Sequence, residues 1–373
     1  MRKYKVGILG CGNIAGNYID HAQRVFSDYY EVTALGDVSV ENAERRASKY
    51  GIVKYGPPEL VYDDPEIDIV VNLTVPAAHE EVTVRALKAG KHVYTEKPLA
   101  CSREGMRHIL EVAEQCGRRI GCAPDSFMSA PAQTAKKALE DGWIGEPIGV
   151  NSICALRGNE YWRPDSDFFY KKGAGPMMDM APYYLNILVS MLGPVASVAA
   201  VGKITWPQRT IKVAPRRGEK IDVEVPTYVS STMTFADGTI ATFVNSFDIW
   251  ATNQPYIEIF GEKGTLVMPD PNRYKGDVLL KRFEDSDWRV LPQFVEYADY
   301  GRGIGIVDMI KAIKEDRPHR ANGRLGYHVT DVIFSVAEAI QSGGTVRIES
   351  SAEKVPGLWL NPDTILCGVV SLK

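Results

Sequence analysis

Over the first third of the chain, short apolar runs alternate with amphipathic segments of helical periodicity. A short continuous apolar run predicts a buried strand, and apolar residues three to four positions apart predict a helix. The runs predict strands at Val6–Gly10, Val32–Asp37, Ile67–Leu73, His92–Thr95 and Arg119–Cys122. The segments between them predict helices at Asn13–Val25, Val40–Lys49, His79–Ala89 and Arg103–Cys116. Because strands that are apolar on both faces are typical of parallel sheets, this alternation predicts an α/β domain with a doubly wound parallel sheet.

From about Ala123 onward, strand signals dominate the pattern after one amphipathic helix, predicted at Pro131–Asp141. Two hairpins are predicted, and their strands are Thr227–Phe235 with Thr239–Phe247, and Ile257–Phe260 with Thr265–Met268. Asp237-Gly238 indicates a type I′ turn in the first hairpin. Two helices near the C-terminal end, about Gly303–Glu315 and Leu325–Gln341, are expected to pack on these elements. The second part is therefore predicted to be an α+β domain with a large, mainly antiparallel open sheet.

The length of 373 residues exceeds what one hydrophobic core usually serves, so we expect two domains, residues 1–123 and 124–373. A net charge of −4 offers no basic face for nucleic acid and no polybasic anchor for a membrane. Neither a signal peptide nor a membrane-spanning run is expected. The six cysteines show no CxxC pairing, so we expect free thiols in a reducing cytoplasm and no metal site.

The most informative motif is VGILGCGNIA at residues 6–15, where an apolar strand runs into a helix. Gly10 lets the chain turn sharply, and Gly12 lets the backbone approach a pyrophosphate. The N–H groups at the start of the helix, around Asn13 and Ile14, attract phosphates. Asp37 closes the next strand and can accept hydrogen bonds from the ribose hydroxyls of the adenosine. This arrangement predicts a Rossmann-type dinucleotide site, the alternative being a glycine turn used only for packing.

The acidic residue favours NAD over NADP as the cofactor. Asp37 would repel a 2′-phosphate, and the next two residues, Val38 and Ser39, supply no cation to compensate. The nearest arginines, Arg45 and Arg46, lie within the following predicted helix.

A second cluster follows two strands of the predicted sheet. Thr74, Pro76 and His79 come after one strand, and Glu96, Lys97 and Pro98 come after the next. Ligands of open parallel sheets bind outside the carboxyl ends of the strands, so both groups should face the nicotinamide end of the dinucleotide. Taken alone, His79 is typical of a helix start and Lys97 of a solvated surface; their joint position at strand ends favours the site.

A third cluster lies in the second domain, in the glycine-rich sequence GAGPMMDMAPYY at residues 173–184. Asp179 and Tyr183 are four positions apart and would share one face of a helix. Pro182 interrupts this segment, so we expect the helix to begin properly only near that residue. Alternatively, Asp179 is a structural carboxylate and Tyr183 is an interfacial tyrosine.

Together, the glycine turn, Glu96-Lys97-Pro98 and the glycine-rich approach to Asp179 resemble the Gfo/Idh/MocA family over essentially the whole chain. The resemblance implies that Lys97 is an active-site lysine and that Asp179 orients the substrate. This chain departs from the family pattern at two positions, with Tyr183 where a histidine is common and Ala181 where a glycine is expected. Tyrosine also occurs there in members resembling glucose–fructose oxidoreductase, so the resemblance still implies acid–base chemistry at this position.

Three further residues are candidates for substrate contact. Trp162 and Arg163 lie in an aromatic stretch that suits the apolar face and hydroxyl rim of a sugar, although packing is the commoner role of such residues. Asp125 directly follows the last strand of the first domain, where a structural turn is the alternative.

These observations predict a cytoplasmic NAD-dependent oxidoreductase that acts on a secondary alcohol or ketone of a sugar, glycoside or cyclitol. Tyr183 is the candidate acid–base group, which for work near pH 8 needs its pKa lowered from about 10. Lys97 would supply the charge that lowers it, and Asp179 would orient the substrate. The alternatives are a redox-neutral enzyme with tightly held NAD and a non-catalytic nucleotide-sensing regulator.

An open sheet leaves one face uncovered, and members of the resembling family pair through it, so a homodimer or homotetramer is expected.

Overall fold

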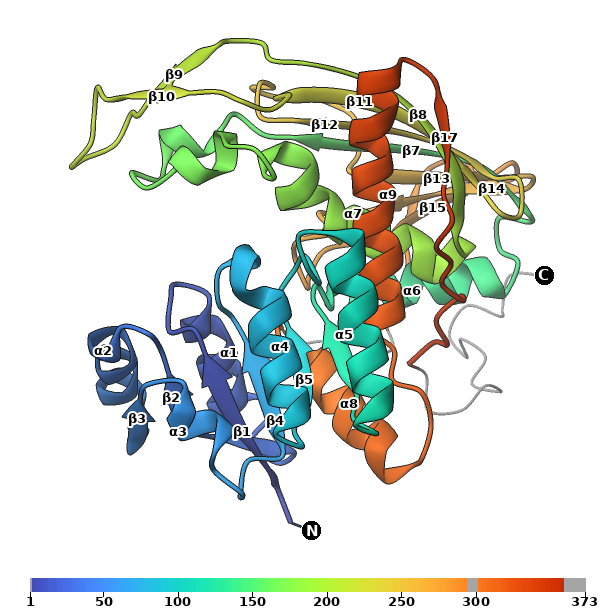
Figure 1. Ribbon diagram of the computed structural model, residues 1–373. Helices are drawn as coiled ribbons and strands as arrows, with labels where there is room; N and C mark the ends of the chain where they lie inside the picture. Colours follow the sequence, from blue (N-terminus) through green and yellow to red (C-terminus); the bar gives the residue numbers. More distant parts are fainter. Residues whose placement is uncertain (1, 294–300, 359–373) are drawn as a thin grey trace. The chain divides into compact units, whose positions relative to one another are not determined.

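A computed structural model describes residues 2–293 and 301–358, and these residues form two compact units (Figure 1). Among the described residues, the first unit covers 2–125 and 301–330, and the second covers 126–293 and 331–358. The break after Asp125 lies two residues beyond the predicted boundary. No helix of the described residues combines the length and apolar composition needed to cross a membrane.

Within its described residues, the first unit contains a six-stranded parallel sheet in the order β3-β2-β1-β4-β5-β6. The strands are β1 (Tyr4–Leu9), β2 (Tyr30–Gly36), β3 (Lys54–Gly56), β4 (Ile69–Asn72), β5 (His92–Thr95) and β6 (Ile120–Cys122). The helices are α1 (Ala15–Arg24), α2 (Val40–Tyr50), α3 (Glu59–Tyr62), α4 (His79–Lys88), α5 (Arg103–Gln115) and α8 (Ile304–Lys314). The doubly wound parallel sheet is therefore confirmed. The sequence pattern missed the short elements β3 and α3.

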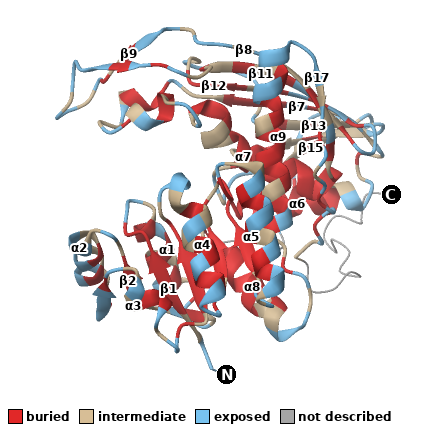
Figure 2. Ribbon diagram, viewed as in Figure 1, coloured by how far each residue is buried: buried red, intermediate tan, exposed pale blue. Residues whose placement is uncertain are grey.

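The central strands of this sheet are buried, as their apolar sequences require (Figure 2). All four residues of β4 and the last four of β1 are buried. Helices α2 and α5 begin at serine caps: Ser39 Oγ accepts a hydrogen bond from the Asn42 N–H, and Ser102 Oγ accepts one from the Gly105 N–H. Capping thus fixes where these two helices begin.

The prediction that both C-terminal helices pack on the second domain is wrong for α8, which belongs to the first unit. A Cβ atom at Gly121 of β6 would lie 2.7 Å from Met309 Cε of α8, and one at Gly305 would lie 2.5 Å from the Tyr94 hydroxyl. These glycines let α8 approach β5 and β6 closely. The hydrophobic pattern of α8 showed a buried face but not the sheet that buries it.

The described residues of the second unit form a nine-stranded sheet in the order β16-β15-β14-β13-β7-β12-β11-β8-β17. Its strands are β7 (Pro147–Ala155), β8 (Val195–Lys203), β11 (Tyr228–Phe235), β12 (Ile240–Ser246), β13 (Ile257–Gly261), β14 (Gly264–Met268), β15 (Leu279–Arg282), β16 (Arg289–Val290) and β17 (Thr345–Arg347). Only β7 and β12 pair in parallel among these strands. The mainly antiparallel sheet and both predicted hairpins are confirmed.

The turn between β11 and β12 differs from the predicted type I′ turn. That turn needs a positive φ at both central residues, but of Asp237 and Gly238 only the glycine has one, at +91°. The Gly238 N–H donates to the Phe235 carbonyl at 3.0 Å, and the Phe235 N–H donates to the Thr239 carbonyl at 2.9 Å. The loop therefore contains three residues, with glycine in its last position. Asp237 instead accepts a hydrogen bond from the Thr239 N–H.

Helices α6 (Ala130–Glu140) and α7 (Gly175–Leu192) pack on one face of this sheet. The Tyr184 ring of α7 stacks obliquely on Phe243 of β12, with 5.1 Å between ring centroids. Helix α9 (Gly323–Ser342) begins in the first unit and continues in the second beyond Thr330. On each strand the residues alternate between this buried face and an opposite face that carries exposed Thr232, Thr242 and Ile240.

A two-stranded ribbon, β9 (Gln208–Thr210) with β10 (Lys220–Asp222), carries a second small core. Its apolar residues are Phe169, Tyr170, Ile211, Ile221, Val223 and Phe247. The Arg209 guanidinium is 4% exposed and contacts the carboxylates of Glu160, at 2.7 Å, and of Asp248. Because a buried cation needs such partners, this network fixes the ribbon to the segment that precedes α7.

Candidate active site

The glycine turn between β1 and α1 is built against the end of β4. Gly10 has a φ of +93°, and a Cβ atom there would lie 2.6 Å from the carbonyl carbon and oxygen of Leu73 and 2.7 Å from the Thr74 nitrogen. Only glycine fits both the backbone conformation and this contact. The turn is closed by hydrogen bonds from the Gly10 N–H to the Gly36 carbonyl and from the Leu73 N–H to the Leu9 carbonyl.

Gly12 provides open space where Gly10 provides close packing. A Cβ atom at Gly12 would meet no described heavy atom within 4 Å. The N-cap of α1 is Ile14, and among the described residues no side chain caps the first N–H groups of this helix. Asn13 is exposed beside them. An unfilled space next to uncapped N–H groups fits the pyrophosphate of a dinucleotide.

Asp37 lies at this turn through its own hydrogen bonds. Its Oδ2 accepts one from the Cys11 N–H at 2.7 Å, and its Oδ1 accepts one from the Ser39 N–H at 2.8 Å. The carboxylate retains lone pairs for ribose hydroxyls, because each oxygen can accept more than one hydrogen bond. Burial and Asp37 together raise the pKa of the Cys11 thiol to about 12, so that thiol stays protonated.

As expected, Val38 and Ser39 supply no cation after Asp37, but an arginine of the following helix reaches the glycine turn. Arg46 of α2 reaches back to the glycine turn, with Nε 3.2 Å from the Cys11 carbonyl and Nη2 2.8 Å from the Gly12 carbonyl. Arg46 lies in the helix predicted for it, and its side chain is long enough to reach the glycine turn. The adenosine end of the candidate site therefore combines a carboxylate with a guanidinium.

Asn72, at the end of β4, is a site residue that sequence reasoning missed. Its side chain is fully buried, and its Nδ2 donates to the His79 carbonyl and to Thr83 Oγ1. Its Oδ1 accepts hydrogen bonds from the N–H and the hydroxyl of Thr74. The polar residue in an otherwise apolar strand was the available signal. It ties Thr74 to the start of α4 and presents Val75 and Pro76 as an exposed loop.

The ring of His79 is buried and contacts two backbone carbonyls. Its Nδ1 lies 2.6 Å from the Pro98 carbonyl oxygen and its Nε2 lies 3.1 Å from the Thr74 carbonyl oxygen. The histidine thus connects the loop after β4 with the loop after β5. These contacts give His79 a structural position beneath the candidate site, and its contact with a cofactor stays a prediction.

Glu96 anchors the residue after it. Its Oε2 accepts a hydrogen bond from the Lys97 N–H at 3.1 Å, and its Oε1 accepts one from the Tyr18 hydroxyl at 2.9 Å. Arg302 Nη1 lies 3.8 Å from the same Oε1. Glu96 is 8% exposed, so its charge is balanced by buried partners instead of water. No local signal in the sequence pointed to Tyr18 or Arg302 as these partners.

Asp125 caps a helix, which favours the structural alternative, and its contact with a substrate stays a prediction. Its side chain is 1% exposed, and its Oδ2 accepts hydrogen bonds from the N–H groups of Gly303 and Gly305, both at 2.9 Å. These groups form the N-terminal turn of α8, where a carboxylate is stabilised by the helix dipole.

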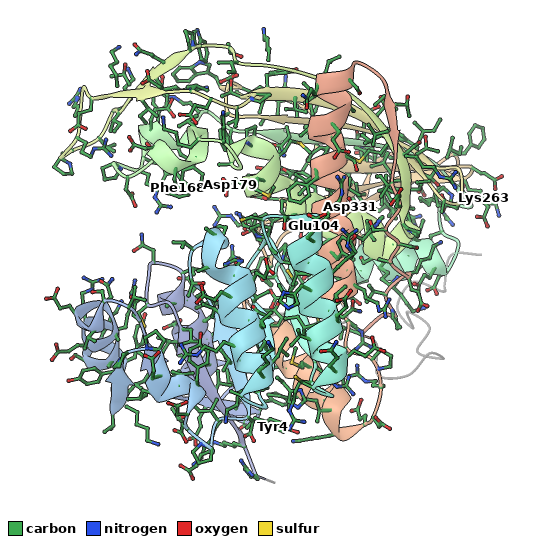
Figure 3. The ribbon with its side chains drawn as sticks, viewed as in Figure 1. Tyr4, Glu104, Phe168, Asp179, Lys263 and Asp331 are labelled. Atoms are coloured by element: carbon green, nitrogen blue, oxygen red, sulfur yellow. The ribbon has the colours of Figure 1, made fainter. Side chains whose placement is uncertain are left out.

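In the second unit, α7 begins at Gly175, seven residues before the predicted start. Pro182 lies inside the helix, and the Asn186 side chain donates to its carbonyl at 2.8 Å. Asp179 is half-buried near the N-terminal end of α7, as labelled in Figure 3, and Tyr183 follows one turn later at 5% exposure. Lys97 belongs to the first unit, whereas Asp179 and Tyr183 belong to the second.

The two candidates from the aromatic stretch, Trp162 and Arg163, lie in different surroundings. Arg163 forms a two-point ion pair with Asp165, both contacts at 2.9 Å, and its guanidinium lies 5.2 Å from the centroid of Phe168. These contacts favour the packing alternative for Arg163. Trp162 is 65% exposed, so its ring remains available for contact with a ligand.

Comparison with known proteins agrees with this geometry. Residues 4–123 match the family described as "Oxidoreductase family, NAD-binding Rossmann fold", and residues 132–267 match the GFO/IDH/MocA C-terminal domain. Inositol 2-dehydrogenase of Pseudomonas savastanoi pv. phaseolicola is 26% identical over 364 residues, covering 92% of this chain and 96% of the relative.

Two solved structures share the fold. An NAD-binding oxidoreductase from Klebsiella pneumoniae has a TM-score of 0.81 and 23% identity, covering 93% of this chain and 99% of its own. Levoglucosan dehydrogenase in complex with NADH and L-sorbose has a TM-score of 0.80 and 21% identity, covering 94% and 100%. The glycine turn, the anchored Glu96-Lys97 pair and the two matching domains lead to one conclusion: this chain belongs to the Gfo/Idh/MocA family of NAD-dependent oxidoreductases.

Proposed function

We propose that this NAD-dependent oxidoreductase acts on a secondary alcohol or ketone of a sugar, glycoside or cyclitol. The observation that carries the proposal is the position of Lys97, two residues after the end of β5 and with its backbone held by Glu96. It lies at the carboxyl edge of the sheet, the edge that also carries the glycine turn and the exposed Val75-Pro76 loop. The substrate class is supported by the relatives named for inositol and levoglucosan.

The bound nicotinamide supplies the acceptor or donor for hydride, and the chain supplies alignment and proton handling. In this proposal the Lys97 ammonium stabilises negative charge on the substrate oxygen. Tyr183 takes the hydroxyl proton during oxidation and returns it during reduction, as a general acid–base group. Asp179, one helical turn before Tyr183, accepts a hydrogen bond from a neighbouring substrate hydroxyl and so orients the sugar ring. Trp162 offers an exposed aromatic face for the apolar side of such a ring.

The direct test is a dehydrogenase screen of the purified full chain with NAD⁺ across monosaccharides, inositols and anhydrosugars, following NADH absorbance. We expect turnover with at least one cyclic polyol and its loss in Lys97→Met. Absence of turnover with every class would refute the proposal as stated. Turnover without added NAD, with nucleotide retained through purification, would instead support redox-neutral hydride exchange between two sugars.

We further propose that the chain works in the cytoplasm as a homodimer or homotetramer that pairs through the open face of the second sheet. On β8, β11 and β12 this face carries uncharged residues: Ser230, Thr232, Thr242, Val244, Ala199 and Val201. Pairing over this part of the face desolvates no charge among these residues. Glu258 of β13 lies on the same face but outside this part. The five described cysteines are free, which suits a reducing compartment.

A further inference from the structure

The imidazole of His79 stands between two backbone carbonyls of different loops. Its Nδ1 lies 2.6 Å from the Pro98 oxygen, its Nε2 lies 3.1 Å from the Thr74 oxygen, and the residue is 1% exposed. A carbonyl oxygen only accepts hydrogen bonds, and a neutral imidazole carries a single N–H. Both contacts are therefore hydrogen bonds only in the charged ring. In the neutral ring, one nitrogen directs its lone pair at an oxygen.

The surroundings of the ring decide which form is present at neutral pH. Burial lowers the pKa of His79 below its ordinary value, and the two carbonyl contacts and Glu96 oppose this effect, while Lys97 adds to it. Glu80, the residue after His79 in α4, contacts His108 of α5 at 2.9 Å. The neutral ring, with one N–H, is accordingly the form that prevails at pH 7.

The two distances indicate which nitrogen keeps that proton. A separation of 2.6 Å between a nitrogen and a carbonyl oxygen requires a hydrogen between them, whereas 3.1 Å is easily relaxed. The proton therefore belongs on Nδ1, facing the Pro98 carbonyl. This carbonyl lies one residue after Lys97, whose N–H donates to Glu96. Lys97 is thus held on its N-terminal side by Glu96 and on its C-terminal side through Pro98.

We propose that His79 is a positioning residue for Lys97: its Nδ1–H holds the Pro98 carbonyl in both charge states, and its Nε2 engages the Thr74 carbonyl only after gaining a proton. The role given to Lys97 rests on the proposed function, but the state of the ring does not. The loop after β4 is therefore linked to the loop after β5 more firmly in acid than at neutral pH.

Two isosteric variants separate this role from simple filling of space. Asparagine places its amide donor near the position of Nδ1, and glutamine places it near that of Nε2. We expect His79→Asn to retain kcat close to that of the wild type, and His79→Gln to lose on the order of 10- to 100-fold, the usual effect of misplacing a reacting group slightly. Both should bind NADH within about twofold of the wild type, since the glycine turn is untouched. Equal loss of kcat in both variants would overturn the positioning role.

Imidazole ¹H–¹⁵N correlation spectra of the full chain, without cofactor, test the ring directly. Signals of His79 are assigned by their loss in His79→Asn. At neutral pH we expect protonated Nδ1 and bare Nε2, and on acidification we expect Nε2 protonation together with a shift of the Thr74 amide. His319 is the matched control, because it is buried, contacts the Ile120 carbonyl and has its pKa lowered to about 4.

The outcomes distinguish this inference from the proposed function. The opposite tautomer, or a Thr74 amide that does not follow the titration, would overturn the inference even if the enzyme oxidises a sugar. The expected tautomer and titration in a protein that turns over no polyol would leave the proton-linked contact established and refute the proposed function instead.

Discussion

A methyl group added at Gly12 should weaken NAD binding without loss of stability, whereas the same group at Gly10 should destabilise the fold. The reason lies in their surroundings. A Cβ atom at Gly12 meets no described heavy atom within 4 Å, but one at Gly10 lies 2.6 Å from the backbone of Leu73. Gly10 also has a φ of +93°, where alanine is strained.

The expected magnitudes follow from these two environments. For Gly10→Ala, the left-handed backbone costs about 1–2 kcal/mol, and forcing the Leu73–Thr74 backbone aside adds about 1–3 kcal/mol. For Gly12→Ala, the free energy of unfolding should change by less than about 1 kcal/mol. A methyl group between the turn and a pyrophosphate should cost about 1–3 kcal/mol of binding, which is a rise in Kd of roughly 5- to 150-fold.

Urea unfolding without ligand and calorimetric titration with NADH measure the two effects separately. Gly238→Ala is a matched control, because Gly238 also has a positive φ, +91°, but no described heavy atom within 4 Å of its Cβ position. The loss of unfolding free energy in Gly238→Ala measures the cost of the positive φ alone. NADH affinity unchanged in Gly12→Ala would refute the placement of the pyrophosphate, and Gly10→Ala no less stable than Gly238→Ala would refute the steric argument.

Three further predictions concern catalysis, cofactor choice and assembly. Tyr183→Phe should lower kcat by about 10²- to 10⁴-fold with little change in NADH affinity. It should also remove an alkaline rise in the oxidation rate, measured by stopped assays from neutral to alkaline pH, and a retained rate and pH profile would assign the proton transfer to another group. Lys97→Ala should lower kcat by at least as much. The wild-type kcat/KM should favour NAD⁺ over NADP⁺ by on the order of a hundredfold. Asp37→Ser should reduce this ratio, because the repelling carboxylate is lost while Arg46 remains beside the turn. An unchanged ratio in Asp37→Ser would exclude the Asp37 carboxylate as the cause of the preference for NAD⁺. Thr232→Arg, on the open face of the second sheet, should reduce the mass measured by light scattering at micromolar concentration, and an unchanged oligomer would place the interface elsewhere.

Much of the first unit followed from local sequence patterns. The strand His92–Thr95 was predicted with its observed bounds, because a short apolar run between a glycine and a charged motif has few other solutions. Gly10, Gly12 and Asp37 were found because a glycine turn followed by an acid is a local signature. What stayed hidden were contacts between distant residues, such as Tyr18 with Glu96 across 78 positions.

In the second unit too, details that depend on side-chain contacts did not follow from the sequence pattern. The hairpin at β11 and β12 was predicted, but its turn type was not, because Asp237 uses its carboxylate on the Thr239 N–H instead of adopting a positive φ. The three-residue loop pairs Thr234 with Ile240, whereas a two-residue turn at Asp237-Gly238 would have paired Thr234 with Ala241.

The start of α7 was misplaced because proline was taken to end the preceding turn. In the structure the helix continues through Pro182, and the Asn186 side chain donates to the Pro182 carbonyl. Proline has no N–H for the Met178 carbonyl four residues earlier, and the periodicity of the sequence does not specify whether a helix tolerates that loss.

The docking of α8 on β5 and β6 has a consequence for how the protein is made. The nucleotide unit is encoded in two pieces, and its second piece, ending at Thr330, is translated about 200 residues after Asp125. At roughly 5–20 residues per second, the ribosome needs about 10–40 s to supply it. During that interval Tyr94 and Gly121 lack their α8 neighbours, and the Asp125 carboxylate lacks the N–H groups that it later caps. The cofactor domain, although first in the sequence, is therefore completed only when most of the second domain has already left the ribosome.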